Sequence, residues 1–305
     1  MAGVMNRGIL TRYLDPALLS RLAGRRIDPR GLVLGNLAGA HASPASGFAV
    51  EFSGHREYVW GDDPKHIDWR VYFTRDKYVV KQYQMEANLT CHLVLDVSAS
   101  MRYGSAAQQK LSYASQMAVA LAYAIVDRGD KVSLATCDEA VLDWVPPSRS
   151  PAQVVRIARQ LDDVKPKRTT KLGECLVELA ARMRRREIVM VFSDFLCDLS
   201  SLTTALDRLR FQRHEVVLFQ TLHHDELTLE FDGSVQFVGL ESADVLLTEA
   251  HELRRAYLDA LARYNARFDE LCGRRRVERV LVDTSRNLGE VLVDYLNQRG
   301  LRRRR

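Results

Sequence analysis

The chain has 305 residues, of which 47% are hydrophobic and 27% are charged, and its formal net charge is +5 at pH 7. This length suffices for one large hydrophobic core with a smaller attachment. No stretch reaches the roughly 18 to 20 uninterrupted apolar residues of a membrane span, and residues 1–15 have no apolar core of the length that a signal peptide needs. We therefore expect a soluble, cytoplasmic protein.

The positions of the cysteines and arginines bear on whether the protein has disulfides, binds zinc or binds nucleic acid. The five cysteines are dispersed and form no CxxC pair, which argues against a disulfide framework and a zinc knuckle. Arginine clusters could meet nucleic acid or an acidic protein; they are Arg182 with Arg184–Arg186, Arg274–Arg276 and Arg302–Arg305. The first two lie where helices are expected to end, and cations favour that end of the helix dipole. We therefore expect no nucleic-acid binding.

Residues 1–88 form an irregular N-terminal extension. Within it, Asp15 followed by Pro16 predicts a capped helix over Pro16–Leu22. Short apolar runs predict strands over residues 47–52 and 77–84. This extension is expected to be β-rich.

Residues 89–300 have a different pattern, in which apolar strands alternate with amphipathic helices. The strands are predicted at 89–97, 132–137, 141–145, 188–192, 216–221 and 280–282, with a small hairpin of 227–231 and 235–238 around Gly233. The helices are predicted at 108–127, 151–161, 172–183, 202–211, 248–271 and 288–296. The alternation predicts an α/β fold, with a doubly wound, mostly parallel sheet and helices on both faces. Residues 301–305 then form a basic tail.

The strand at 89–97 ends in the run LVLDVSASM, in which Asp96, Ser98 and Ser100 occupy alternating positions. A strand that ends in a carboxylate and then turns can present that carboxylate and two hydroxyls toward one point. An all-oxygen ligand set suits Mg²⁺ or Mn²⁺ rather than zinc or copper. The opening motif therefore predicts part of a hard-cation site.

Two later segments can complete that site. Functional crevices of such sheets lie beyond the carboxyl ends of the strands, where Asp194 follows the strand VMVFS, and the turn KRTTKL offers Thr169 or Thr170. Taken singly, serines after strands commonly cap helices and aspartates commonly end strands. The combination of three loops favours a shared cation.

This combination resembles the metal-ion-dependent adhesion site of von Willebrand factor type A domains. The resemblance implies that Asp96, Ser98, Ser100, Thr170 and Asp194 bind a divalent cation. In that family glycine usually precedes the threonine, whereas Arg168 and Thr169 precede Thr170 here, so the choice between the two threonines stays open. The resemblance covers about residues 89–296.

A second resemblance concerns the segment EYVWGDDPKHIDWRVYFTRDKYVVKQY, residues 57–83. It is similar to the segment of domain of unknown function 58 proteins that has a GDDP turn, an IDW motif and a VKQ strand. The resemblance implies association with MoxR-type AAA+ ATPases. The residues themselves predict a structural role, since Asp62 and Asp63 can bond nearby amides and Asp68 can cap a helix or pair with Arg56 or Arg70. We also expect Trp69 to be buried.

Two functions remain open at this point. The first is a non-enzymatic module in which a partner's acidic side chain completes the coordination of Mg²⁺ or Mn²⁺, the partner being a MoxR-type AAA+ ATPase. The alternative is a magnesium-dependent phosphatase of haloacid-dehalogenase type, with Asp96 as nucleophile and Asp194, Asp198 and Lys171 assisting. Those phosphatases usually carry an aspartate two residues after the nucleophile, where this chain has Ser98, and a serine does not transfer a proton in the same way near neutral pH.

Overall fold

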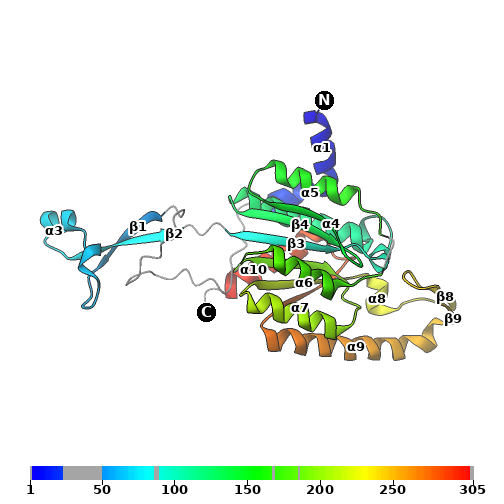
Figure 1. Cartoon of the computed structure of the whole chain (residues 1–305). Coiled ribbons are helices and arrows are strands. Elements are labelled where there is room, and N and C mark those ends of the chain that lie inside the picture. Colours follow the sequence, from blue (N-terminus) through cyan, green and yellow to red (C-terminus); the bar gives the residue numbers. More distant parts are fainter. Residues whose placement is uncertain (1, 23–49, 86–88, 167–168, 185, 303–305) are drawn as a thin grey trace. The chain divides into compact units, whose positions relative to one another are not determined.

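The computed structural model describes residues 2–22, 50–85, 89–166, 169–184 and 186–302. The chain divides into two compact units, one made of Met1–Arg30 with Leu89–Arg305 and the other of Gly31–Asn88. The extension expected over residues 1–88 is therefore divided. Helix α1 (Ala2–Tyr13) packs against α5 (Ala152–Asp162), and α2 (Pro16–Leu22) packs against α10 (Leu288–Arg302), so both helices belong to the larger unit (Figure 1).

The larger unit is built on a six-stranded sheet in the order β10-β7-β6-β3-β4-β5. All neighbouring pairs are parallel except β4 with β5. The strands are β3 (Thr90–Asp96), β4 (Lys131–Cys137), β5 (Val141–Ser148), β6 (Ile188–Ser193), β7 (Glu215–Leu222) and β10 (Glu278–Asp283). Every residue of β6 is buried, because the apolar run IVMVF must be covered on both sides.

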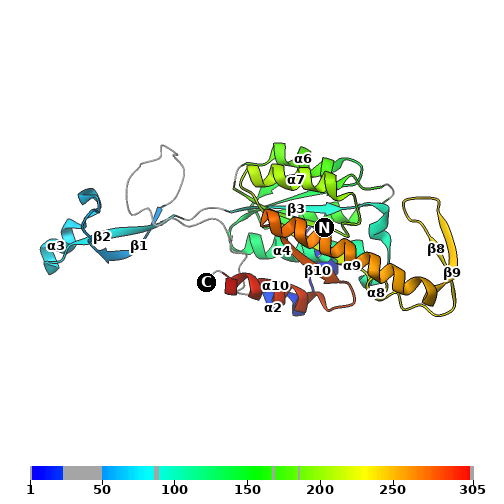
Figure 2. The same ribbon diagram turned by 90° about the horizontal axis from the view of Figure 1, so that it is seen from below.

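Helices cover both faces of this sheet. On one face α4 (Lys110–Asp127) packs against α5 and α10, and on the other α6 (Leu172–Arg182) packs against α7 (Leu199–Phe211), which contacts α9 (Ala250–Arg275) (Figure 2). The core of the second face joins the sheet to α6, α7 and Phe268 of α9. The predicted α/β fold class is confirmed.

Most predicted elements appear with ends shifted by a few residues. The predicted cap is present, since Ala17 N donates to Asp15 Oδ1 at 2.8 Å. The first two arginine clusters lie at helix ends as predicted: Arg182 ends α6 and pairs with Glu178, and Arg275 ends α9 and pairs with Asp207. Helix α10 continues to Arg302 and so includes the start of the predicted basic tail. Residues 303–305 lie outside the described part of the chain.

The predicted hairpin of 227–231 with 235–238 is wrong. Residues 224–228 form the short helix α8 (His224–Thr228), because the His223 ring accepts a hydrogen bond from Asp225 N while Glu226 Oε2 accepts one from His223 N at 2.8 Å. This reciprocal cap starts a helix. The hairpin instead pairs β8 (Ser234–Val238) with β9 (Val245–Glu249), and α9 consequently begins at Ala250 rather than at Thr248.

The smaller unit pairs β1 (Val50–Glu57) with β2 (Val79–Met85) in antiparallel fashion around a 3-10 turn (Pro64–His66) and α3 (Trp69–Arg75). Residues 47–49 of the predicted first strand lie outside the described residues. Asp62 accepts two hydrogen bonds of 2.8 Å from Arg56 and one from Val59 N, and Asp68 caps α3 by accepting from Arg70 N. The predicted backbone bond and helix cap are present, but Arg56 pairs with Asp62 rather than with Asp68, whose side chain lies 2.9 Å from His55 Nε2. Trp69, by contrast, is half exposed rather than buried.

Candidate metal and docking site

The predicted site lies at the carboxyl edge of the central strands. Strand β3 ends at Asp96, and its parallel neighbour β6 ends at Ser193, one residue before Asp194. Parallel strands in register bring their carboxyl ends to the same edge. This is the edge from which α8 follows β7 (Figure 1). The sheet therefore brings the two aspartates together from positions almost a hundred residues apart in the sequence.

Asp96 is completely buried and accepts hydrogen bonds on both oxygens. Ser98 N donates to Oδ1 at 2.9 Å, and the hydroxyl of Ser193 donates to Oδ2 at 2.6 Å. Burial, followed by the nearby charge of Asp194, raises the pKa of Asp96 to about 6, although the bonds from Ser193 and Ser98 oppose the rise. The raised pKa marks a carboxylate whose negative charge is incompletely compensated.

The predicted hydroxyls gather around this carboxylate. Ser98 precedes a short 3-10 helix (Ala99–Arg102), which places its Oγ 3.1 Å from Ser100 Oγ. Thr170 Oγ1 donates to Asp96 Oδ2 at 3.3 Å, whereas Thr169 Oγ1 donates to Glu139 at 3.0 Å. The structure thus places Thr170, and not Thr169, beside the carboxylate.

Asp194 has a cationic partner that the motif does not indicate. The ammonium group of Lys110, the first residue of α4, lies 2.8 Å from Asp194 Oδ2 and 2.7 Å from Glu226 Oε1. Burial lowers the pKa of Lys110, but the charges of Asp194 and Glu226 outweigh it and raise the pKa overall, so this lysine is charged. The cluster of Asp96, Asp194, Glu226 and Lys110 carries two negative charges in excess when its members are ionised.

The donor chemistry fits a hard divalent cation. The side chains of Ser98 and Thr170 bond to Asp96, and the Ser98 hydroxyl bonds in turn to that of Ser100. All of these groups are oxygen donors, which Mg²⁺ and Mn²⁺ select. Among the residues that the structure describes, no group of three or more His, Cys, Asp or Glu side chains could hold a metal. A cation at this edge would therefore depend on the hydroxyls as well as on the carboxylates.

Sequence reasoning missed four contributors to this edge. Ser193 immediately precedes the predicted ligand Asp194, and Glu226 lies in the polar run after β7. A local sequence pattern could therefore have indicated both residues. Lys110 and Glu241 have no local signal, because their contacts join residues far apart in the chain. Ser100 N donates to Glu241 Oε1 at 3.3 Å across 141 positions.

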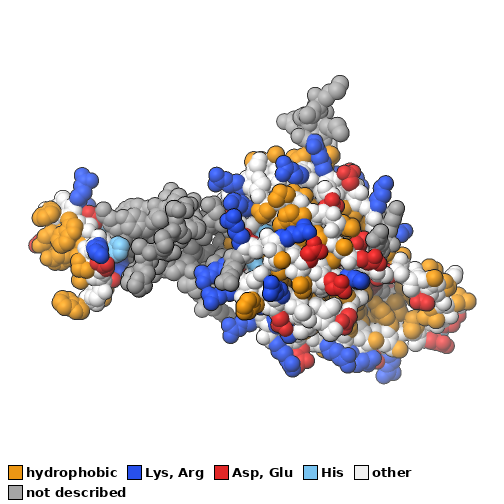
Figure 3. All heavy atoms as spheres, in the orientation of Figure 1, with side chains coloured by type: hydrophobic (Ala, Val, Ile, Leu, Met, Phe, Trp, Pro, Cys, Tyr) orange, Lys and Arg blue, Asp and Glu red, His pale blue; other side chains and the backbone are white. Residues whose placement is uncertain are grey.

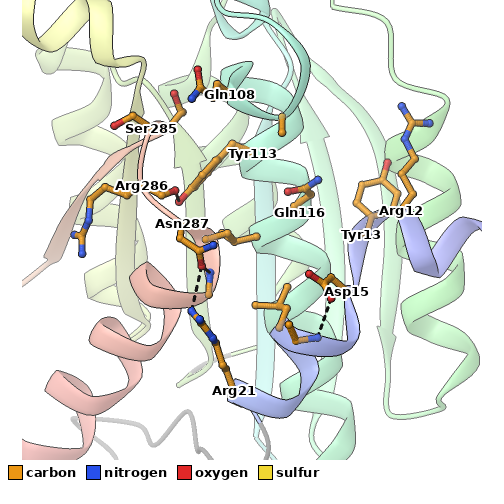
Figure 4. Close-up of a pocket in the computed structure, with 16 residues that line it drawn as sticks. Arg12, Tyr13, Asp15, Arg21, Gln108, Tyr113, Gln116, Ser285, Arg286 and Asn287 are labelled. Atoms are coloured by element: carbon orange, nitrogen blue, oxygen red, sulfur yellow. Dashed lines mark hydrogen bonds between the residues drawn. The ribbon is translucent and has the colours of Figure 1, made fainter.

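A separate cavity of about 490 Å³ contains none of the predicted ligands. It lies among α1, α2, the start of α4 and the loop before α10 (Figure 4). Its three arginines already have partners: Arg12 pairs with Asp162, Arg21 Nη1 lies 3.3 Å from Asn287 Oδ1, and Arg286 pairs with Asp294 at 2.9 Å. These pairings leave the carboxyl edge of β3 and β6 as the better candidate site.

The cysteines take no part in the site. All five are free thiols, and Cys91 and Cys137 are buried in the sheet as expected. Burial raises the pKa of the Cys197 thiol to about 12, which keeps it unreactive at neutral pH. None of the helices in the described ranges combines the length and apolarity needed to cross a membrane.

The mostly parallel sheet, covered by helices on both faces and carrying a DxSxS motif at the end of β3, defines a von Willebrand factor type A-like domain. The family model described as "Protein of unknown function DUF58" matches residues 54–267. The chain belongs to this family, and the expected membership is confirmed.

The chain is also similar to individual proteins and solved structures. The uncharacterized protein Rv1480 of Mycobacterium tuberculosis is 26% identical over 234 residues, covering 76% of this chain and 73% of that protein. BatB from Bacteroides thetaiotaomicron is 14% identical, with a TM-score of 0.46 over 70% of this chain and 99% of its own. The VWA domain of SpRpn10 is 12% identical, with a TM-score of 0.37 over 68% and 94% of the two chains.

Proposed function

We propose that this protein is a non-enzymatic interaction module that uses Mg²⁺ or Mn²⁺ to dock an acidic side chain of a partner protein. The observation that carries the proposal is the gathering of Asp96, Ser98, Ser100 and Thr170 at one sheet edge. Asp194 lies close enough to raise the pKa of Asp96. These five side chains are the proposed ligands.

An incomplete ligand shell supports docking. Mg²⁺ holds about six oxygens, whereas the five proposed ligands include only two carboxylates, one of which is already paired with Lys110. Water would complete such a shell, and an incoming carboxylate can replace that water. The two excess negative charges of the cluster of Asp96, Asp194, Glu226 and Lys110 match the charge of one divalent cation.

The proposed partner is a MoxR-type AAA+ ATPase. This partner follows from the DUF58 resemblance in the GDDP-to-VKQ segment. The sequence contains no GxxxxGK[ST] phosphate-binding loop, so in this proposal the nucleotide chemistry belongs to the partner.

Two contacts weigh against the phosphatase alternative. The Asp198 side chain accepts from Ser200 N and Ser201 N at the start of α7, which makes it a helix cap. Lys171 is exposed, and the cation beside Asp194 is Lys110. No described observation favours phosphoryl transfer over docking.

The test combines metal binding with partner capture. Immobilised wild-type protein, Asp96→Ala and the exposed control Asp259→Ala are each incubated with the purified ATPase, in Mg²⁺ and in chelator. We expect capture by wild type and control in Mg²⁺ only, and none by Asp96→Ala. Capture that persists in chelator, or in folded Asp96→Ala, contradicts the proposal. Release of phosphate from an aryl phosphate that is lost in Asp96→Asn would restore the phosphatase alternative.

A further inference from the structure

The tip of the β8–β9 hairpin carries an acidic residue to the candidate site. Residues 239–244 join the two strands, and Glu241 within them accepts a hydrogen bond from Ser100 N at 3.3 Å. Ser100 is one of the proposed metal ligands. The side chain that reaches this position is therefore of the chemical class that the site is proposed to take from a partner.

The tip has a defined shape rather than a loose one. Gly239 N donates to Asp244 O at 2.8 Å, and Ser242 Oγ donates to Asp244 Oδ2 at 2.6 Å. A Cβ atom at Gly239 would lie 2.6 Å from Ser242 Oγ and 2.8 Å from Ser242 O, so a larger residue there would force the turn to shift. These contacts fix the turn on which Glu241 lies.

The base of the hairpin is anchored, whereas its strands are largely uncovered. Ala250, the first residue of α9, is completely buried, and its N–H donates to Gly233 O at 3.1 Å. Several apolar side chains of the strands and tip are exposed, as Figure 3 shows on the part of the surface that the hairpin forms; they are Val238, Leu240, Val245, Leu246 and Leu247. Because little apolar surface is buried beneath it, the hairpin can leave the site at low cost in hydrophobic free energy.

We propose that Glu241 is an internal acidic ligand of the cation site, and that it occupies the place of the partner's acid until the hairpin moves away. This inference rests on the proposed function. A tethered ligand acts at an effective concentration in the millimolar range or above, so it competes strongly with a free partner of modest affinity. The partner that it fits is an acidic side chain preceded by an apolar residue, as Glu241 itself is preceded by Leu240.

The test uses the full chain as wild type, Glu241→Gln, Asp96→Ala and the exposed α9 control Glu252→Gln. Mn²⁺ binding is measured by electron paramagnetic resonance, and a short peptide with one glutamate between a leucine and a serine serves as the acidic probe. We expect Glu241→Gln to bind Mn²⁺ about tenfold more weakly, because affinity follows the number of charged ligands. At saturating Mn²⁺ it should bind the peptide about tenfold more tightly than wild type and control, because its internal competitor is gone.

Hydrogen–deuterium exchange separates ligation from a merely structural contact. Mn²⁺ should slow exchange in residues 234–249 of wild type and have no such effect in Glu241→Gln. Equal peptide affinity in wild type and Glu241→Gln overturns the internal-ligand inference, while Mn²⁺ binding that is lost in Asp96→Ala leaves the proposed function standing. Absence of Mn²⁺ binding to wild type overturns both.

Discussion

The ammonium group of Lys110 lies 2.8 Å from Asp194 Oδ2, and each of the two side chains is only 1% exposed. A buried charge is tolerated when it is paired, and removing one partner leaves the other uncompensated. Lys110 also pairs with Glu226, so one cation serves two carboxylates. The pair fixes the start of α4 to the end of β6 and sets the charge of the candidate site.

Replacing Lys110 by Met should therefore lower the free energy of unfolding by about 3–5 kcal/mol in the absence of divalent cations. Methionine keeps much of the side-chain volume but leaves Asp194 and Glu226 unpaired. Urea unfolding in chelator measures the loss. The matched control Lys131→Met alters an exposed lysine at the start of β4, and should change stability by less than about 0.5 kcal/mol. Equal stability of the two variants would show that the buried pair does not contribute as proposed.

The raised pKa of Asp96 predicts a pH dependence of stability. The folded protein binds this proton more tightly than the unfolded chain does, because the pKa rises from 3.8 to about 6. Between these two values stability should fall as pH rises, by up to about 3 kcal/mol if the whole shift is realised. Unfolding in chelator between pH 4 and 7 measures the fall; Asp96→Asn should flatten the profile, while the exposed control Asp259→Asn should retain it.

Divalent cations should oppose the loss of folding stability that follows the ionisation of Asp96. A cation binds the ionised carboxylate and competes with the proton, so Mg²⁺ should stabilise wild type more at pH 7 than at pH 5. Thermal unfolding at the two pH values with and without Mg²⁺ gives the comparison. A stabilisation that does not depend on pH, or that persists in Asp96→Asn, would place the cation elsewhere.

The smaller unit depends on a helix cap that can be tested by itself. Asp68 accepts a hydrogen bond from Arg70 N at the start of α3, and its Oδ2 lies 2.9 Å from His55 Nε2. Asp68→Ala should cost about 1 kcal/mol through loss of the cap, which limited proteolysis within residues 69–75 can detect as faster cleavage. Asp68→Asn keeps a capping oxygen and should be cleaved more slowly than the alanine variant. Similar cleavage of both variants would mean that the cap is not what holds α3.

Features that depend on residues close together in the sequence could be predicted, whereas contacts between residues far apart in the sequence could not. Periodicity revealed the sheet because runs such as IVMVF at β6 must be buried on both faces. The predicted hairpin differs from the observed one because the reciprocal cap of His223 and Glu226 makes a helix of a segment whose apolar residues suggest a strand. Local motifs indicated Asp96, Ser98 and Ser100, but Lys110 reaches Asp194 across 84 positions, and no local pattern records such a contact.

The two threonines before α6 provide the sharpest test of the ligand set. Thr170 Oγ1 lies 3.3 Å from Asp96 Oδ2, whereas Thr169 Oγ1 is bonded to Glu139. Valine replaces the hydroxyl with a methyl group of similar size, so Thr170→Val should weaken Mn²⁺ binding and Thr169→Val should not. We expect a loss of about tenfold for Thr170→Val, equivalent to about 1.4 kcal/mol. Calorimetric titration of both variants decides the matter, because a larger loss in Thr169→Val would assign the ligand to the other threonine.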